Sequence, residues 1–150
     1  MEIALYQPDI AGNAGTIARL CACLGLKLTI IEPTGFLWDD SRLRRAGMDY
    51  LDIAAITRAP SWEHFLAARG NRRLVLLTTK ASPGYLEFRF ESDDILLLGR
   101  ESAGVPEAVH DEATASITIP MAAGARSLNV ALACAMVTGE AMRQLRGGGL

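Results

Sequence analysis

The N-terminal part of the chain contains the pattern that most constrains its fold, a strand, a helix and a second strand in close succession. Glu2–Tyr6 has the pattern of a short buried strand, residues 15–24 carry apolar side chains at helical spacing, and residues 26–31 have the pattern of a second strand. Gly25 stands where that helix would end. Because such a helical crossover joins parallel strands with a right-handed connection, the pattern predicts a parallel α/β sheet.

The rest of the chain continues this alternation of strands and helices. Residues 74–78 and Ile95–Leu98 are continuous apolar runs, typical of strands covered on both faces. Weaker patterns predict strands at residues 53–57 and 117–119 and near Phe88, and helices at residues 39–48, Trp62–Arg69 and 127–145. Ser61 is expected to cap the second of these helices and Gly70 to end it. The alternation predicts a doubly wound α/β fold, with one domain over residues 1–150.

The overall composition excludes few classes of protein. Hydrophobic residues make up 50% and charged residues 21% of the chain, and the formal net charge is -2. This balance is weak evidence against a classical nucleic-acid binder, although local basic clusters exist. The longest apolar stretch, residues 128–137, is about half the length that a membrane span needs, and the acidic start does not resemble a signal peptide. We therefore expect a soluble cytoplasmic protein.

The usual signatures of metal, redox and phosphate chemistry are missing from the sequence. Cys21, Cys23 and Cys134 lack zinc-finger or thioredoxin spacing, so we expect three reduced thiols packed as small hydrophobic side chains. His64 and His110 are expected at the surface, and no cluster has the spacing of metal ligands. The chain also lacks a phosphate loop, a dinucleotide fingerprint and a nucleophile elbow. We expect neither a metal nor a nucleophilic hydrolase.

The glycine-rich loops that follow the predicted strands are the best candidates for a ligand site, because parallel sheets bind ligands at the carboxyl ends of their strands. Three of these regions stand out, at residues 13–19, 97–106 and 119–133. Each also has a purely structural interpretation. Asn13 could cap the first helix, Pro106 could lie in the first turn of a helix, and Ser127 could cap the last helix.

Taken together, the three regions resemble the motifs of the SPOUT methyltransferases. The matching residues are Asn13, Gly15 and Arg19, then Leu98, Gly99, Glu101 and Gly104, and finally Ile119-Pro120-Met121 with Ser127-Leu128-Asn129-Val130. The resemblance covers nearly the whole chain, including residues 31–36, 38–50 and 77–80. It is closest to the members that methylate the ribose 2′-oxygen of the wobble nucleotide 34, a cytidine or modified uridine, in tRNA.

The resemblance implies a fold, a cofactor and partners that the residue pattern alone does not. It implies a C-terminal deep trefoil knot, bound S-adenosylmethionine, a homodimer formed through the first and last helices, and recognition of a tRNA anticodon stem-loop, that of a leucine tRNA. The cofactor contacts that it implies are Leu77, Thr78, Gly99, Glu101, Gly104, Ile119, Met121, Ser127 and Leu128. Apolar strand ends beside glycine loops suit an adenine ring.

The resemblance also implies catalytic and RNA-binding residues. Because a guanidinium is a poor base, we expect Arg19 to stabilise the developing alkoxide or to grip a phosphate, with a base role open if the cofactor's charge lowers its proton affinity. Asn13 would hold the loop or the ribose, and Ser127 and Asn129 would order the cofactor loop or bind the substrate. The expected RNA-binding residues are Arg42, Arg44, Arg45 and Arg126.

Two further function hypotheses remain open from the sequence. The chain could methylate another tRNA or rRNA position, or it could be a catalytically degenerate, cofactor-binding protein that interacts with RNA. One departure bears on the first of these, because Gly139 stands where close relatives often carry an aromatic residue. The missing aromatic affects the choice of nucleotide rather than the class of reaction.

Overall fold

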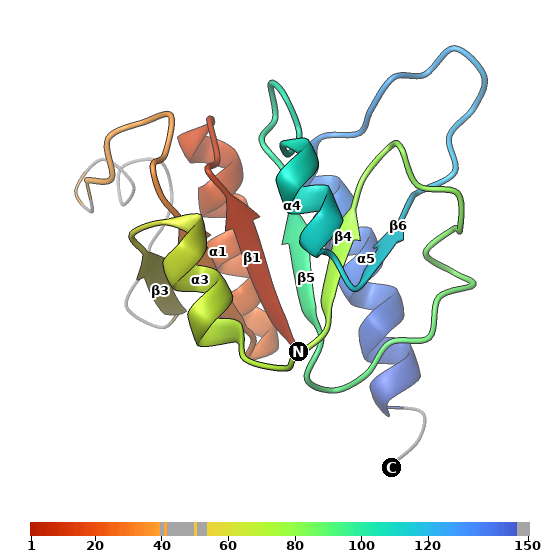
Figure 1. Cartoon of the computed structure of the whole chain (residues 1–150), viewed down its shortest axis with the longest axis horizontal. Coiled ribbons are helices and arrows are strands. Elements are labelled where there is room, and N and C mark those ends of the chain that lie inside the picture. The colour runs from red at the N-terminus through yellow and green to blue at the C-terminus, as the bar shows by residue number, and fades with distance from the viewer. Residues whose placement is uncertain (40, 42–49, 51–53, 147–150) are drawn as a thin grey trace.

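A six-stranded parallel sheet forms the centre of the molecule in the computed structural model, which describes residues 1–39, 41, 50 and 54–146 (Figure 1). The sheet order is β3-β2-β1-β5-β4-β6, and every strand pair is parallel. The strands are β1 (Glu2–Tyr6), β2 (Lys27–Ile31), β3 (Ala55–Ala59), β4 (Leu74–Leu77), β5 (Ile95–Leu98) and β6 (Ala115–Ile117). The predicted parallel α/β fold is confirmed.

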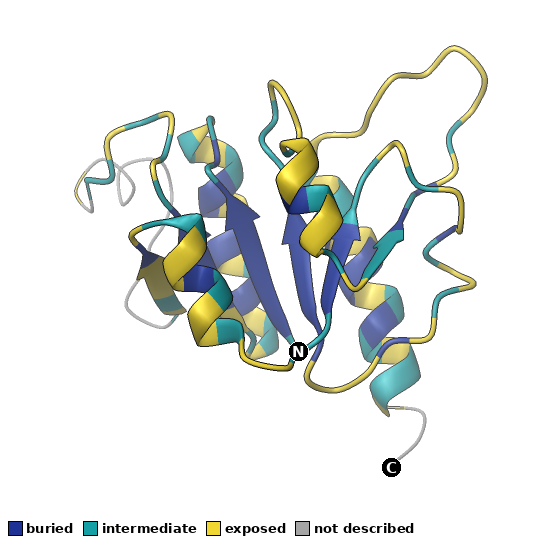
Figure 2. Ribbon diagram, in the orientation of Figure 1, coloured by how far each residue is buried: buried dark blue, intermediate teal, exposed yellow. Residues whose placement is uncertain are grey.

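The described helices cover both faces of this sheet. α1 (Ala11–Leu24) and α5 (Val130–Arg146) lie on one face, and α3 (Trp62–Arg69) and α4 (Glu107–Glu112) on the other (Figure 1). Ile3 and Leu5 of β1 pack into the first of these layers, whereas Ala4 and Tyr6 pack into the second. Figure 2 shows the central strands buried throughout. Because both faces are covered, these strands are apolar at nearly every position. Two buried polar residues, Glu2 and Thr29, pair with each other, since the Thr29 hydroxyl donates to Glu2 Oε1 at 2.6 Å.

The order of the strands reverses direction at β1, which pairs with β2 on one side and with β5 on the other. The chain builds β2 and β3 outward from β1, then crosses to build β4, β5 and β6 beyond it. At such a switch point the loops after the two central strands separate and leave a crevice between them. The loops that follow β1 and β5 are therefore placed where a ligand site is expected.

The last helix begins later than the sequence predicts, and the predicted Ser127 cap is wrong. α5 starts at Val130, and the Asn129 side-chain oxygen accepts hydrogen bonds from the backbone N–H groups of Ala131 (2.9 Å) and Leu132 (3.3 Å). Asn129 therefore satisfies the free donors of the first turn. Ser127 and Leu128 therefore lie outside the helix, in the loop that precedes it.

The first helix also begins elsewhere, at Ala11 rather than at residue 15, and Ile10 precedes it without a side-chain cap. Asn13 therefore lies inside the first turn, so the cap interpretation of Asn13 is wrong. The predicted end is confirmed, since Gly25 adopts the left-handed conformation with φ 68°. Ser61 and Gly70 flank α3 as predicted, and the Ser61 hydroxyl accepts from the His64 backbone N–H at 3.2 Å.

Other element boundaries differ by small shifts. β3 begins later than predicted, β6 ends earlier, and Pro106 immediately precedes α4 instead of lying in its first turn. In the described residues no strand forms near Phe88; an isolated bridge between Gly84 and Thr118 is the nearest sheet-like contact. The predicted helix at residues 39–48 falls almost entirely outside the described residues.

The burial of the cysteines and the lengths of the helices can also be compared with the predictions from the sequence. All three cysteines are free; Cys21 and Cys134 are buried as predicted, but Cys23 is exposed. Packing of Cys23 was wrongly expected, because it lies on the outer side of α1, away from the sheet. Among the described helices, none has both the length and the apolar content to cross a membrane.

Candidate functional site

A cavity of about 540 Å³ opens at the carboxyl edge of the sheet, beside the switch point. Its walls come from the ends of β4 and β5, the loops that follow them, the segment after β6 and the start of α5. All nine residues expected to contact the cofactor line it: Leu77, Thr78, Gly99, Glu101, Gly104, Ile119, Met121, Ser127 and Leu128. Cavities of roughly 300–1,000 Å³ typically hold small organic ligands and cofactors.

A tight glycine turn forms one wall of this cavity. Arg100 and Gly104 exchange two backbone hydrogen bonds of 2.9 Å each, and Gly104 has φ 62°, a conformation that favours glycine. A Cβ atom added to Gly99 would lie 2.7 Å from the Gly104 carbonyl carbon. Glycine is therefore required at residue 99, and the turn presents bare backbone to the cavity.

Apolar side chains form the opposite part of the lining. Leu77 is the last residue of β4, and Ile119 lies in the segment that follows β6. Both are at least partly buried. Leu128 and Ile10 also line the cavity, yet they are 39% and 49% exposed. Apolar side chains left open to solvent inside a concave site are surfaces that a bound ligand would cover.

A chain of hydrogen bonds joins the three sequence regions at the mouth of the cavity. The Asn129 side-chain amide donates to Asn13 Oδ1 at 3.1 Å, and the Asn13 amide donates to Glu101 Oε1 at 3.5 Å. The other Glu101 oxygen accepts from the Asp9 backbone N–H at 2.7 Å. Residues separated by about ninety positions or more are thereby held together. Asn13, Ser127 and Asn129, three of the four predicted catalytic residues, all line the cavity.

Asp9 adds an ionic contact to this network that sequence reasoning did not single out. Its carboxylate pairs with the Arg100 guanidinium at 2.8 Å and accepts from the Ser102 backbone N–H at 3.0 Å. Hydrogen bonds from Ser102 and Arg100 lower the pKa of Asp9 to about 2. Asp9 lies in the loop after β1, which was expected to carry ligand residues, but an acid there had no distinguishing pattern.

Arg19, the fourth predicted catalytic residue, lies apart from the cavity of its own chain. It is exposed on α1, and its guanidinium carbon stands 4.8 Å from the centre of the Tyr50 ring. That distance is within the range of a cation–π interaction. Because an α-helix turns once in about 3.6 residues, Asn13 and Arg19 point to different sides of α1.

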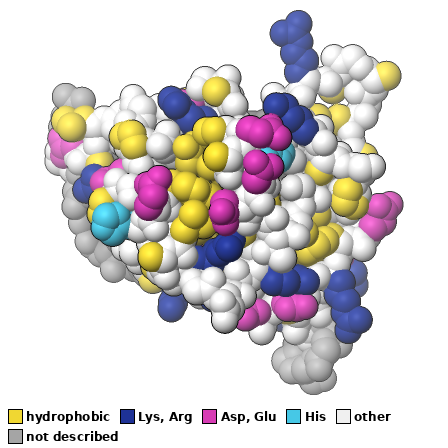
Figure 3. All heavy atoms as spheres, viewed as in Figure 1, with side chains coloured by type: hydrophobic (Ala, Val, Ile, Leu, Met, Phe, Trp, Pro, Cys, Tyr) yellow, Lys and Arg dark blue, Asp and Glu magenta, His cyan; other side chains and the backbone are white. Residues whose placement is uncertain are grey.

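The expected RNA-binding arginines are only partly placed. Arg42, Arg44 and Arg45 lie outside the described residues, whereas Arg126 is exposed on the loop that precedes α5. Figure 3 shows the face covered by α3 and α4, where basic and acidic side chains are interspersed around a central apolar strip. This face therefore offers no extended basic surface among the residues that are described.

Two further cavity residues escaped the sequence analysis. Lys80, after β4, and His110, on α4, both line the cavity, so the expectation that His110 is an ordinary surface residue was incomplete. His64 is exposed as expected. His110 could not be recognised in the sequence, because its place depends on α4 folding back across the ends of the strands.

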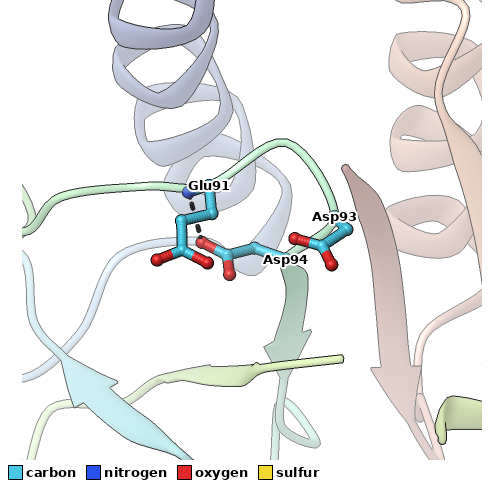
Figure 4. Close-up of side chains that lie close together, drawn as sticks. All are labelled: Glu91, Asp93 and Asp94. Atoms are coloured by element: carbon cyan, nitrogen blue, oxygen red, sulfur yellow. Dashed lines mark hydrogen bonds between the residues drawn. The ribbon is translucent and has the colours of Figure 1, made fainter. Parts of the chain in front are cut away.

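An acidic cluster lies at the opposite, amino edge of the sheet, where Glu91, Asp93 and Asp94 come together before β5 (Figure 4). The buried Asp94 carboxylate accepts two hydrogen bonds of 2.7 Å from Arg73 and one of 2.8 Å from the Glu91 backbone N–H. These hydrogen bonds also raise the pKa of Arg73. Arg73 therefore neutralises the buried carboxylate, and the cluster ties β4 to the turn before β5.

A parallel α/β sheet with a glycine-walled cavity at its switch point defines a class of proteins that bind nucleotide-like ligands. Comparison with known proteins narrows this class. The SpoU rRNA methylase family matches residues 1–139, so the chain belongs to that family.

Individual relatives are similar over nearly the whole of this chain. The tRNA (cytidine(34)-2′-O)-methyltransferase of Beijerinckia indica is 60% identical over 145 residues, which cover 95% of this chain and 91% of the relative. A solved structure that describes the 2-OH methylation of C/U34 on tRNA has a TM-score of 0.92 at 39% identity, with 97% and 96% of the two chains covered. An AdoMet-bound rRNA methyltransferase of Sinorhizobium meliloti has a TM-score of 0.86 at 31% identity, with 96% of this chain and 56% of that chain covered.

Proposed function

We propose that this protein transfers the methyl group of S-adenosylmethionine to the ribose 2′-hydroxyl of nucleotide 34, a cytidine or modified uridine, in a tRNA. One observation carries the proposal: the three regions that resemble methyltransferase motifs converge on one cavity, which all nine expected cofactor residues line. The 60% identity to a relative named for this reaction supports the same substrate.

The residues of the cavity fit S-adenosylmethionine. The bare backbone of the Gly99–Gly104 turn allows the close approach that a Cβ atom at Gly99 would prevent. Leu77, Ile119 and Leu128 would provide apolar surface for the adenine ring, and the Glu101 carboxylate would supply negative charge that attracts the positively charged sulfonium. When bound, this cofactor supplies a methyl group on an excellent leaving group, so the protein's task is to position the ribose oxygen and to assist loss of its proton.

Asn13 and Asn129 are the residues best placed to orient the ribose. Their side-chain amides are fixed by each other and by Glu101 at the mouth of the cavity. An amide that uses one donor and one acceptor in such a chain retains a second donor for a substrate oxygen. Ser127 lines the same cavity, and its hydroxyl would order the loop before α5 or bind the substrate.

Arg19 would act in a homodimer. It does not line the cavity of its own chain, so in this proposal it reaches the substrate bound at the cavity of a second copy. The outer side of α5 supports such a pairing, because Leu132 is 60% and Met136 42% exposed beside the small Gly139. At the second cavity the guanidinium would stabilise the developing alkoxide or grip an adjacent phosphate.

The C-terminal trefoil knot is a further part of the proposal. α5 runs beside α1, and the segment that connects β4 to β5 crosses over its distal end. There the Gln144 side chain donates to the Phe88 carbonyl at 2.9 Å and accepts from the Phe90 backbone N–H at 3.0 Å. A helix held beneath an earlier connection is the arrangement expected if the chain end has passed through that connection.

The tRNA partner, the leucine isoacceptor, the cytoplasmic location and the single domain over residues 1–150 remain proposals of the same kind. The net charge of -2 is unfavourable for RNA binding as a whole, so binding would depend on local cations. Arg126 is exposed beside the cavity, and Arg42, Arg44 and Arg45 supply a basic segment in the sequence.

Incubation with labelled S-adenosylmethionine and undermodified tRNA, followed by mapping of the methyl group, tests the proposed function. We expect one methyl group per tRNA, on the ribose of nucleotide 34. A methyl group elsewhere in tRNA or in rRNA would replace the target but keep the reaction. Cofactor binding without transfer to any RNA would favour the degenerate alternative, and absence of cofactor binding would overturn the proposal.

A further inference from the structure

The Asp9 carboxylate accepts hydrogen bonds from two residues of the cavity wall, and no role described above accounts for them. Its Oδ1 atom accepts from Arg100 Nε at 3.1 Å and from Arg100 Nη2 at 2.8 Å. Its Oδ2 atom accepts from the Ser102 backbone N–H at 3.0 Å and also from the Ser102 hydroxyl. Both Arg100 and Ser102 line the cavity. Charge-assisted hydrogen bonds of this kind are about twice as strong as neutral ones.

Further contacts hold the backbone that carries Asp9. The Gly35 N–H donates to the Pro8 carbonyl at 2.9 Å, and a Cβ atom at Gly35 would lie 2.9 Å from the Asp9 Cα. The Asp9 N–H donates to Glu101 Oε2 at 2.7 Å. The carboxylate therefore projects from backbone that contacts with Gly35 and Glu101 hold in place.

We propose that Asp9 is a positioning residue for the methyl-transfer site, which holds the Arg100 and Ser102 wall of the cavity in the conformation that accepts S-adenosylmethionine. The inference rests on the proposed function. Asp9 does not itself line the cavity, whereas Arg100 and Ser102, the residues that it contacts, do. Asp9 therefore acts through these two neighbours.

The charge state of Asp9 supports this role. Hydrogen bonds from Ser102 and Arg100 lower its pKa to about 2, so the carboxylate is ionised at every pH at which the protein would work. The side chain is 17% exposed and that of Arg100 37%, which leaves the pair only partly screened by water.

The Asp9→Asn variant tests the proposal, because it keeps the size of the side chain but removes the charge. It also places an amide N–H donor opposite the donors of Arg100 and Ser102. We expect the Kd for S-adenosylmethionine, measured by calorimetry, to rise roughly tenfold, whereas kcat at saturating cofactor changes less than about threefold. Asp93→Asn is the matched control, since this exposed acid lies at the opposite edge of the sheet, and its Kd should equal that of the unmodified protein.

Ser102→Ala provides a second, independent variant that leaves Asp9 intact. We expect it to raise the Kd roughly threefold, and the double variant Asp9→Asn/Ser102→Ala to bind less weakly than the product of the two single effects predicts, because the two groups share one contact. If Asp9→Asn fails to fold, the Ser102→Ala measurement decides alone.

Two outcomes would overturn the inference. An unchanged Kd in folded Asp9→Asn protein, with or without a lower Tm, would show that the contact is only a structural tie. An unchanged Kd in Ser102→Ala would do the same. Failure of the unmodified protein to bind S-adenosylmethionine would instead overturn the proposed function, and the inference with it.

Discussion

Asn129 donates a 3.1 Å hydrogen bond from its side-chain amide to Oδ1 of Asn13, and this contact joins the start of the last helix to the start of the first. The same Asn129 side chain caps α5 through its oxygen. One residue therefore fixes both where the last helix begins and how the mouth of the cavity is built. Its two roles can be separated by substitution.

Asn129→Ser should keep the cap but remove the bridge to Asn13, because a shorter hydroxyl can still accept from the first turn. Asn129→Ala should lose both. We expect Asn129→Ala to lower the free energy of unfolding by about 1 kcal/mol, and Asn129→Ser by a few tenths. Both variants should lower kcat substantially. Equal turnover in Asn129→Ser and the unmodified protein would show that the bridge has no part in the reaction.

Arg19 substitutions test the electrostatic role proposed for it across a dimer. Arg19→Ala should lower kcat by roughly 100-fold, the scale seen when a transition-state charge loses one stabilising group. Arg19→Lys should recover part of this loss, since it keeps the charge but not the planar fork. Normal turnover in both variants would exclude the proposed role. Mixing Arg19→Ala protein with a cavity-defective variant should restore activity if the sites are shared.

Tyr50 should affect the same step, because its ring lies 4.8 Å from the Arg19 guanidinium carbon. We expect Tyr50→Leu to lower kcat a few-fold by releasing the guanidinium, and Tyr50→Phe to behave like the unmodified protein, since the ring face is kept. Steady-state kinetics with tRNA as the varied substrate measures this. Equal kcat in the Phe and Leu variants would argue against the cation–π contact.

Gly99→Ala should abolish cofactor binding, because the new Cβ atom would lie 2.7 Å from the Gly104 carbonyl carbon. The wall of the cavity would have to open to relieve this clash. Gly84→Ala is the matched control, since a Cβ atom added there would lie 3.4 Å from a Pro120 side-chain atom, an ordinary van der Waals distance. We expect calorimetry to detect no binding for Gly99→Ala and normal binding for Gly84→Ala. Normal binding in both would mean that the turn is easily deformed.

The affinity for tRNA should fall steeply with salt, because phosphate contacts release counterions. Arg126→Ala should weaken binding and reduce the slope of log K against log salt by about 1 if this side chain contacts one phosphate. Filter binding at several salt concentrations gives both values. A slope near zero for the unmodified protein would contradict an electrostatic mode of binding.

The cysteines should differ sharply in reactivity. Burial raises the pKa of Cys21 and of Cys134 to about 12, so neither forms a thiolate at neutral pH, whereas Cys23 is exposed. A thiol reagent should therefore modify one cysteine in the folded protein and all three after denaturation. Cys23→Ser should remove the native reaction. Rapid modification of the buried pair would indicate local opening between α1 and α5.

Much of the sheet could be predicted from local pattern. The mainly apolar runs of Glu2–Tyr6 and Ile95–Leu98 coincide with β1 and β5, because strands buried on both faces have few polar positions to obscure them. The starts of α1 and α5 were predicted poorly, whereas that of α3 was predicted correctly. At Ser127 and Asn129 two capping residues compete within three positions, and the choice depends on the contact with Asn13, which is distant in the sequence.

The candidate site divides in the same way. The residues that line the cavity were predicted because the resemblance fixed their identity and parallel topology brought their loops to one edge. Asp9 and His110 were missed because an acid in a loop and a histidine on a short helix carry no local signal. Arg19 was expected among the catalytic residues, and its separation from the cavity of its own chain followed only from the direction in which α1 presents it.

The sequence by itself therefore determined the fold class and the edge of the sheet at which a ligand is expected, because apolar periodicity and glycine positions are local properties. The expected cofactor residues came from the resemblance to the SPOUT methyltransferases. Only the tertiary structure decided that Asn129 rather than Ser127 caps α5 and that Asn13 joins Asn129 to Glu101. It also decided that Asp9 anchors the turn after β5. The contacts of Asn13 and of Asp9 join residues far apart in the chain. They can form only once the sheet has brought the loops together.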